Sequence, residues 1–153
     1  SEESQVMDEF DDIQILLAED SALDAELAMT ALKEAKLASH ITWVKDGEEA
    51  LDYLFCRGRY ADRPNVPPRL VLLDLKMPKV DGIEVLTAVK SDERLKDIPI
   101  VMMTSSQEES DIAKSYELGV NSYIVKPLDF DSLSEVTRKA GYYWLTINRA
   151  TPH

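Results

Sequence analysis

Apolar residues along the chain fall into short continuous runs, each followed at once by polar or turn residues. The clearest run, Leu70–Leu73, has no polar break and leads directly into Asp74. An apolar run of this length, stopped by turn residues, indicates a β-strand that is buried on both faces of a sheet. Four further runs predict strands at 13–18, 41–44, 98–103 and 121–125.

Helical patterns alternate with these strands. Ser21, Asp46 and Ser106 are each followed three positions later by an acidic residue, which is a capping-box pattern for a helix start. These starts predict helices over 21 to about 38, over 46 to about 56 and over 106–118, the last of which Gly119 closes. Two further helices are predicted, one after Asp81-Gly82 and one over 130 to about 148. The apolar stripe of the first helix is expected to be Leu23, Leu27, Ala31 and Ala35.

This alternation predicts an α/β fold, a doubly wound five-stranded parallel sheet with helices on both faces. It places one domain over residues 13–148, after a flexible acidic arm at 1–12 and before a short tail at 149–153. Ligands of such sheets bind at the carboxyl ends of the strands, near the point where the strand order reverses.

Polar residues with matching chemistry stand at those carboxyl ends: Glu19, Asp20, Asp74, Thr104 and Lys126. Two carboxylates about 4 Å apart repel each other by roughly 4 kcal/mol at an effective dielectric constant near 20, so a group of three calls for a cation. Oxygen ligands favour Mg²⁺, and no histidine or cysteine is placed to favour zinc. Together these groups can hold and attack a phosphoryl group, with Asp74 as the nucleophile.

Composition narrows the function. The 153 residues carry a net charge of −12, which disfavours nucleic-acid binding. The sequence contains no apolar run of about 18 residues, so no membrane span is predicted, and the first residues lack a signal-peptide pattern. The single cysteine, Cys56, excludes an internal disulfide. We therefore expect a cytoplasmic protein.

The motifs at the strand ends resemble those of the receiver domain of two-component response regulators. The resemblance spans about residues 13–148 and implies the flavodoxin-like strand order 2-1-3-4-5. The spacings from Asp74 to Thr104 and from Thr104 to Lys126 are usual for that family. The matching motifs are Glu19-Asp20, Asp74-Leu-Lys-Met-Pro78, Asp81-Gly82, Thr104-Ser105 and Lys126-Pro127.

The resemblance implies a role for each residue of the acidic site. Asp74 would be the phosphoacceptor for a sensor histidine kinase. Asp20 and Asp74 would bind Mg²⁺ with the backbone carbonyl of Lys76, and Glu19 would lie nearby. The only chemistry expected is self-catalysed, Mg²⁺-dependent phosphoryl transfer to Asp74 and hydrolysis from it. Glu19 stands where the family more often has Asp, and Lys76 occupies a position that tunes phosphate lifetime, as does Ser106.

The resemblance also implies a switch. Lys126 would pair with the phosphoryl group, Thr104 would move towards it, and Tyr123 would change rotamer in response. The Lys126–Pro127 bond is usually cis in this family, and the small Ser105 leaves the site open to a donor.

Two segments point to partners. The loop 57–69 is rich in arginine and proline, and is either a solvated connection or a docking surface for an acidic partner. With the segment 141–148, it resembles the small single-domain regulators that partner phytochrome histidine kinases. Aromatic residues late in the last helix predict a homodimer interface formed by Tyr142, Tyr143, Trp144 and Ile147.

Four other classes fit less well. A haloacid-dehalogenase phosphatase needs an acid two residues after its nucleophile, where Lys76 stands, and a flavodoxin needs a phosphate-cradling loop where Glu19-Asp20 would repel the phosphate. Neither histidine is placed as in a sensor kinase, since His40 begins a strand and His153 is the last residue. A receiver-like scaffold that is never phosphorylated remains the alternative function.

Overall fold

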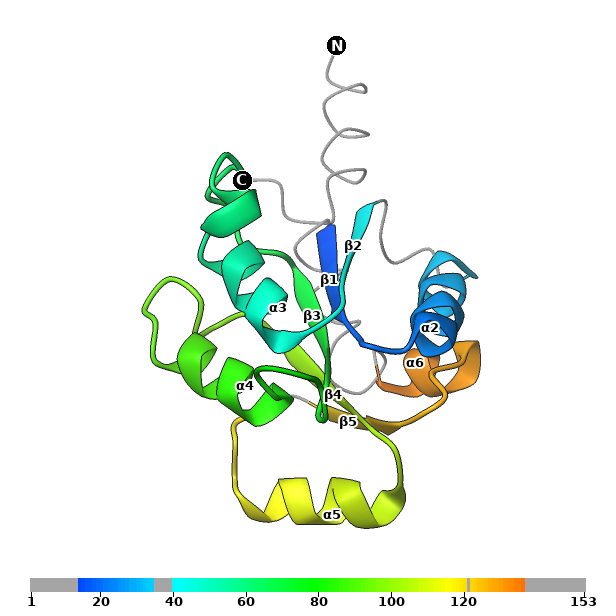
Figure 1. Cartoon of the computed structure of the whole chain (residues 1–153). Coiled ribbons are helices and arrows are strands. Elements are labelled where there is room, and N and C mark those ends of the chain that lie inside the picture. The colour runs from blue at the N-terminus through cyan, green and yellow to red at the C-terminus, as the bar shows by residue number, and fades with distance from the viewer. Residues whose placement is uncertain (1–13, 35–39, 121, 137–153) are drawn as a thin grey trace, which may run out of the picture.

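The computed structural model describes residues 14–34, 40–120 and 122–136. Five parallel strands form one sheet in the order β2-β1-β3-β4-β5, which confirms the predicted topology (Figure 1). The strands are β1 (Gln14–Ala18), β2 (His40–Val44), β3 (Leu70–Asp74), β4 (Ile100–Thr104) and β5 (Ser122–Val125).

Helices cover both faces of this sheet. The helices are α2 (Ala22–Glu34), α3 (Gly47–Leu54), α4 (Gly82–Lys90), α5 (Gln107–Ser115) and α6 (Phe130–Val136), with a short 3₁₀ turn, η1, at Gly58–Tyr60. One apolar core packs α3, α4 and α5 against one face of the sheet, and a second packs α2 and α6 against the other (Figure 1). No helix in these ranges is long and apolar enough to cross a membrane.

The strand β3 lies at the centre of the sheet, and all five of its residues are buried. Its last residue, Asp74, pairs with Met103 on β4, while Ala18 on β1 pairs with Leu73. On the far side, Thr104 pairs with Val125. This register brings the carboxyl ends of four strands to one edge of the sheet, where the polar residues follow.

A capping box predicts two reciprocal hydrogen bonds, and at these helix starts only the first of the two forms as predicted. The side chains of Ser21, Asp46 and Ser106 each accept a hydrogen bond from the backbone N–H three residues later, as predicted. The reciprocal bonds go elsewhere, because Glu49 accepts from Lys45 N and Glu109 accepts from Ser105 N. Each carboxylate therefore binds the residue before the cap instead of the cap itself.

Two details of the predicted helices are wrong. The buried face of α2 is formed by Ala25, Ala28, Ala31 and Leu32, whereas Leu23 and Leu27 are 66% and 41% exposed. Small alanines let the helix backbone lie close to the sheet. Helix α5 ends at Ser115 instead of residue 118.

The early end of α5 has a local cause. Its last turn closes with tighter hydrogen bonds, from Tyr116 N to Ala113 O and from Glu117 N to Lys114 O. Glu117 then takes a positive φ of 50°. The backbone has therefore left the helix before Gly119, which was predicted to close it.

The arginines of the loop 57–69 contact the domain itself. Arg57 pairs with Asp52 at 2.9 Å, and Arg59 pairs with Glu49 at 3.5 Å. Arg63 stacks on the ring of Tyr53, 4.0 Å from its centroid. These contacts tie three of the four arginines of the loop to residues of helix α3.

Several predictions concern residues outside the described ranges. They are the acidic arm at 1–12, the end of the first helix at 35–38, the last helix beyond Val136, the tail at 149–153 and the interface residues Tyr142, Tyr143, Trp144 and Ile147.

Candidate functional site

Lys126 lies at the centre of a cluster of carboxylates at the carboxyl edge of the sheet. Its ammonium nitrogen is 3.1 Å from Glu19 Oε1, 3.2 Å from Asp74 Oδ2 and 3.2 Å from Asp24 Oδ2. The side chains of Glu19 and Asp74 are only 1% and 3% exposed. Because burial strengthens charge interactions, these ion pairs fix the lysine side chain firmly.

Glu19 is held from both sides of the strand end. Its carboxylate oxygen Oε2 accepts a hydrogen bond from Ser21 N at 3.0 Å, and its backbone carbonyl accepts one from the indole N–H of Trp43 at 2.7 Å. The neighbouring strand β2 therefore supports the first acidic position. Glu19 is predominantly a rigid, buried partner of Lys126.

The protonation of Asp74 reflects its surroundings. Burial, followed by a hydrogen bond and charge repulsion from Glu19, raises the pKa of Asp74 to about 8, although Lys126 opposes this shift. For Lys126, burial acts to lower the pKa, but Asp74 and Glu19 outweigh it and raise the pKa above its ordinary value. One lysine therefore does not fully compensate the two buried carboxylates.

A divalent cation fits the remaining negative charge. One carboxylate oxygen from each of Glu19, Asp20 and Asp74 lies within 4.8 Å of the others. Asp20 is exposed, so the group opens to solvent on its side. Oxygen donors of this kind suit Mg²⁺, which keeps several waters and takes one or two protein carboxylates. The chemistry of the donor set therefore fits the predicted metal.

The two predicted switch residues lie on neighbouring strands. Thr104 is buried, and its hydroxyl donates to the carbonyls of Ser106 at 3.2 Å and Ile124 at 3.5 Å. Tyr123 is half-buried, and the ammonium of Lys114 lies 5.6 Å from its ring centroid. Burial raises the pKa of the Tyr123 hydroxyl. In this arrangement the Thr104 proton is directed to backbone oxygens.

The backbone around the site is tightly packed. The Lys126–Pro127 peptide bond is cis, as the resemblance implied. A side chain at Gly82 would bring its Cβ within 2.5 Å of the carbonyl oxygen of Asp74, and Gly82 N donates to Leu75 O at 2.8 Å. Only glycine fits this approach of α4 to the end of β3.

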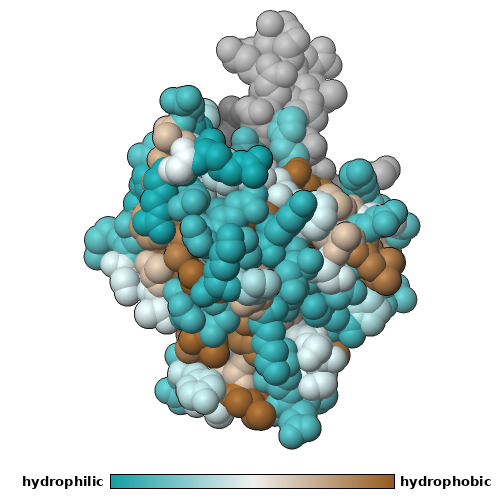
Figure 2. Space-filling model, in the orientation of Figure 1, coloured by the Kyte–Doolittle hydropathy of each residue, from teal (hydrophilic) through white to brown (hydrophobic). Residues whose placement is uncertain are grey.

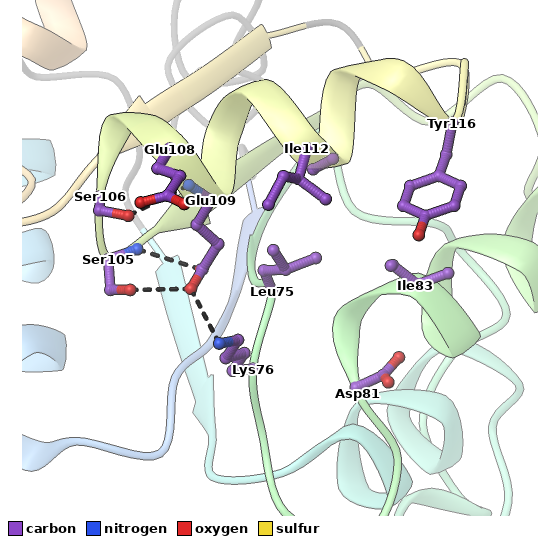
Figure 3. A pocket seen from close by; sticks show the side chains of 11 residues that line it. Leu75, Lys76, Asp81, Ile83, Ser105, Ser106, Glu108, Glu109, Ile112 and Tyr116 are labelled. Carbon is purple, nitrogen blue, oxygen red and sulfur yellow. Dashed lines mark hydrogen bonds and ion pairs between the residues drawn. The ribbon is translucent and has the colours of Figure 1, made fainter.

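Lys76 joins the site to helix α5. Its ammonium lies 3.3 Å from Glu109 Oε2, and its backbone N–H donates to Asp74 Oδ1 at 3.4 Å. Glu109 also accepts hydrogen bonds from the backbone N–H and hydroxyl of Ser105, at 3.2 and 2.8 Å (Figure 3). Burial acts to raise the pKa of Glu109, but Ser105 and Lys76 together lower it.

The structure brings the predicted residues Glu19, Asp20, Asp74 and Lys126 together, and adds two acidic residues that the sequence indicated only as members of capping boxes. Asp24 pairs with Lys126, although its position suggested only a cap. Glu109 lies in the first turn of α5, where its acidic character also suits the helix dipole. Its spacing from Ser105 is the one signal that could have indicated a contact.

Comparison with known proteins identifies the family. The family model for the response regulator receiver domain matches residues 15–138. The probable methanogenesis regulatory protein FilR2 of Methanothrix harundinacea is 42% identical over 95% of this chain and 92% of its own. Response regulator Rcp1 of Synechocystis is 39% identical over 86% and 88% of the two chains, and one of its solved structures is a Mn²⁺-bound form.

Solved structures agree. The bacteriophytochrome response regulator RtBRR is 50% identical, with a TM-score of 0.80 over 84% of this chain and 77% of that one. The phosphorylated cyanobacterial phytochrome response regulator RcpA is 40% identical, with a TM-score of 0.71 over 88% and 94%. The chain therefore belongs to the response regulator receiver-domain family.

Proposed function

We propose that this protein is a response regulator that accepts a phosphoryl group on Asp74 from a sensor histidine kinase. The observation that carries the proposal is the position of Asp74. It is a buried carboxylate at a strand end, 3.2 Å from Lys126 and close enough to Asp20 to share a cation. Mg²⁺ would be held by Asp20 and Asp74, with Glu19 beside them and the carbonyl of Lys76 as a further ligand.

The transfer forms a bond between a carboxylate oxygen of Asp74 and the phosphorus atom, while the bond from phosphorus to the donor's histidine nitrogen breaks. The bound cation would neutralise charge on the phosphoryl oxygens. Lys126 lies where its ammonium can pair with one of those oxygens, and it remains charged because its pKa is raised. Hydrolysis returns Asp74 to a carboxylate and releases phosphate, so the protein acts only on its own aspartate.

Phosphorylation would shift a conformational equilibrium. The new oxygens accept hydrogen bonds, so they compete for the Thr104 hydroxyl that now donates to Ser106 and Ile124. Movement of Thr104 would leave space behind it on the side of Tyr123, on the adjacent strand. The surface around α5, β5 and α6 would then change its affinity for partners.

The similarity to the bacteriophytochrome response regulator RtBRR and the phytochrome response regulator RcpA supports a phytochrome histidine kinase as the donor. We also propose that the protein acts in the cytoplasm. FilR2 is a probable methanogenesis regulatory protein, so a regulator of similar sequence serves another response. We also propose a homodimer through Tyr142, Tyr143, Trp144 and Ile147, on the strength of their aromatic and apolar side chains alone.

Intact mass after incubation with Mg²⁺ and acetyl phosphate tests the proposal. The wild type should gain the mass of one phosphoryl group, Asp74→Asn should gain none, and the matched surface variant Asp97→Asn should behave as the wild type. If wild type and Asp74→Asn both stay unmodified, even with a cognate phosphorylated kinase, the protein is a receiver-like scaffold. Gel filtration of the same samples tests the dimer.

A further inference from the structure

A groove of about 530 Å³ opens between the β3–α4 loop and helix α5. Its floor and walls include Leu75, Ile83, Ile112 and Tyr116, and acidic groups of Asp81 and Glu108 lie along it. In Figure 3, Ile112 points towards Leu75, and Tyr116 points towards Ile83 across the groove. Its volume falls within the range of protein sites that accept ligands or partner side chains.

Two large apolar side chains, one on α5 and one at its C-cap, are exposed. Ile112 is 54% exposed and the C-cap residue Tyr116 63% exposed, whereas α5 buries only Ser110 and Ala113. Tyr116 keeps helical φ and ψ values, so it lies next to Ile112, four positions earlier, and the two side chains form one apolar strip. Figure 2 shows apolar surface around α5 within a largely hydrophilic face. Exposed apolar strips framed by polar groups mark interaction sites.

The charge of the groove determines which chemistry a partner must have to bind there. Lys76 is the basic residue among those lining it, and its ammonium is already paired with Glu109 at 3.3 Å. Glu108 is exposed and Asp81 half-buried, so their carboxylates leave the groove negative. The whole chain adds to this field with its net charge of −12. A partner must therefore combine apolar anchors with basic flanking residues.

We propose that this groove docks an amphipathic helix of a partner protein, with aliphatic anchors over Ile112 and Tyr116 and lysine or arginine facing Glu108 and Asp81. Helices that bind grooves place anchors at positions i, i+3, i+4 and i+7. The walls of the groove begin directly after Asp74 and Thr104, at Leu75 and Ser105. Docking thus contacts the loops that leave the site, and it already takes place on the unphosphorylated protein.

The test uses the full ¹⁵N-labelled chain and a synthetic helical peptide with leucines at those four positions and lysines elsewhere. Its addition should shift amide resonances of residues 75–83 and 105–116, without phosphate or metal. A peptide with the same leucines and glutamates in place of the lysines should leave the spectrum unchanged. Shifts confined to other parts of the chain, or equal shifts with both peptides, would overturn the proposal.

Matched variants separate docking from general attraction to an acidic protein. Ile112→Ser should raise the Kd for the lysine peptide by about tenfold, as loss of an interface anchor does. Leu23→Ser, which removes a side chain of 66% exposure on α2, should leave Kd unchanged. Glu108→Lys should weaken binding more than Glu26→Lys, also on α2. Equal effects within either pair would refute the groove as the docking site.

Discussion

The ammonium nitrogen of Lys126 lies 3.2 Å from a carboxylate oxygen of Asp74, and the lysine side chain is only 16% exposed. The same ammonium also contacts Glu19 and Asp24. One half-buried cation thus pairs with three carboxylates, which follow β1, lie in the first turn of α2 and end β3. These ion pairs hold the site in shape before any metal or phosphoryl group binds. Removing the charge of the lysine should therefore lower the free energy of unfolding.

Replacing Lys126 with methionine should reduce the free energy of unfolding by about 3 kcal/mol, because removal of one partner leaves buried carboxylates without compensation. Urea denaturation without metal measures this change. The matched control is Lys96→Met, which breaks a pair with Glu93, a side chain of 90% exposure, and should cost less than about 1 kcal/mol. Equal losses in the two variants would show that Lys126 does not compensate the cluster.

Mg²⁺ should stabilise the wild type against heat. A ligand that binds only the folded state at about ten times its Kd adds roughly 1.4 kcal/mol. Asp20→Asn should abolish most of this gain, because it removes an exposed ligand from the carboxylate group. Asp97→Asn, which removes the same charge from an exposed position elsewhere, should keep it. A metal-dependent rise in Tm that is the same in Asp20→Asn and wild type would place the metal elsewhere.

The sequence was sufficient to locate Asp74, Thr104 and Lys126 at one edge of the sheet. Each follows an apolar run, and parallel strands put all their carboxyl ends on the same side. That argument needs only the order and type of elements. It does not need the rotation of any helix or the direction of any side chain, and for this reason it succeeded.

Features that depend on the rotation of a helix or on the direction of a side chain were predicted wrongly or not at all. For the first helix, the pattern favoured Leu23 and Leu27, with Ala31 and Ala35, as the buried stripe. The structure buries Ala31 of that stripe but leaves both leucines exposed, and it buries Ala25, Ala28 and Leu32 instead. Likewise, Asp24 lies at a capping position, yet its carboxylate turns to Lys126, a residue far along the chain. Such choices depend on tertiary contacts that no local pattern encodes.

The Glu109 side chain should stabilise the start of α5 more than its neighbour does. Glu109→Ala removes two hydrogen bonds from Ser105 and the ion pair with Lys76, so the free energy of unfolding should fall by about 1–2 kcal/mol. Glu108→Ala removes an exposed acid from the same helical turn, with a similar helix-dipole contribution, and should cost about 0.5 kcal/mol or less. Chemical denaturation of both variants gives the comparison. Similar losses would mean that the contacts of Glu109 contribute nothing beyond its charge.

Tyr60 should ionise at unusually high pH. Its hydroxyl donates to Glu49 Oε1 at 2.8 Å, and burial, then this hydrogen bond and the charge of Glu49, raise its pKa to about 12. Because the folded pKa exceeds the unfolded value near 10, the contact stabilises the fold fully below about pH 10 and is lost as pH rises towards 12.

The ultraviolet absorbance of tyrosinate, taken as the difference between wild type and Tyr60→Phe, measures this ionisation directly. At pH 11 about a tenth of Tyr60 should be ionised in the folded protein, against about nine-tenths in urea, where the pKa returns to about 10. Circular dichroism at the same pH verifies that both proteins are still folded. Ionisation of Tyr60 to the same extent with and without urea would show that Glu49 and burial leave its pKa unshifted.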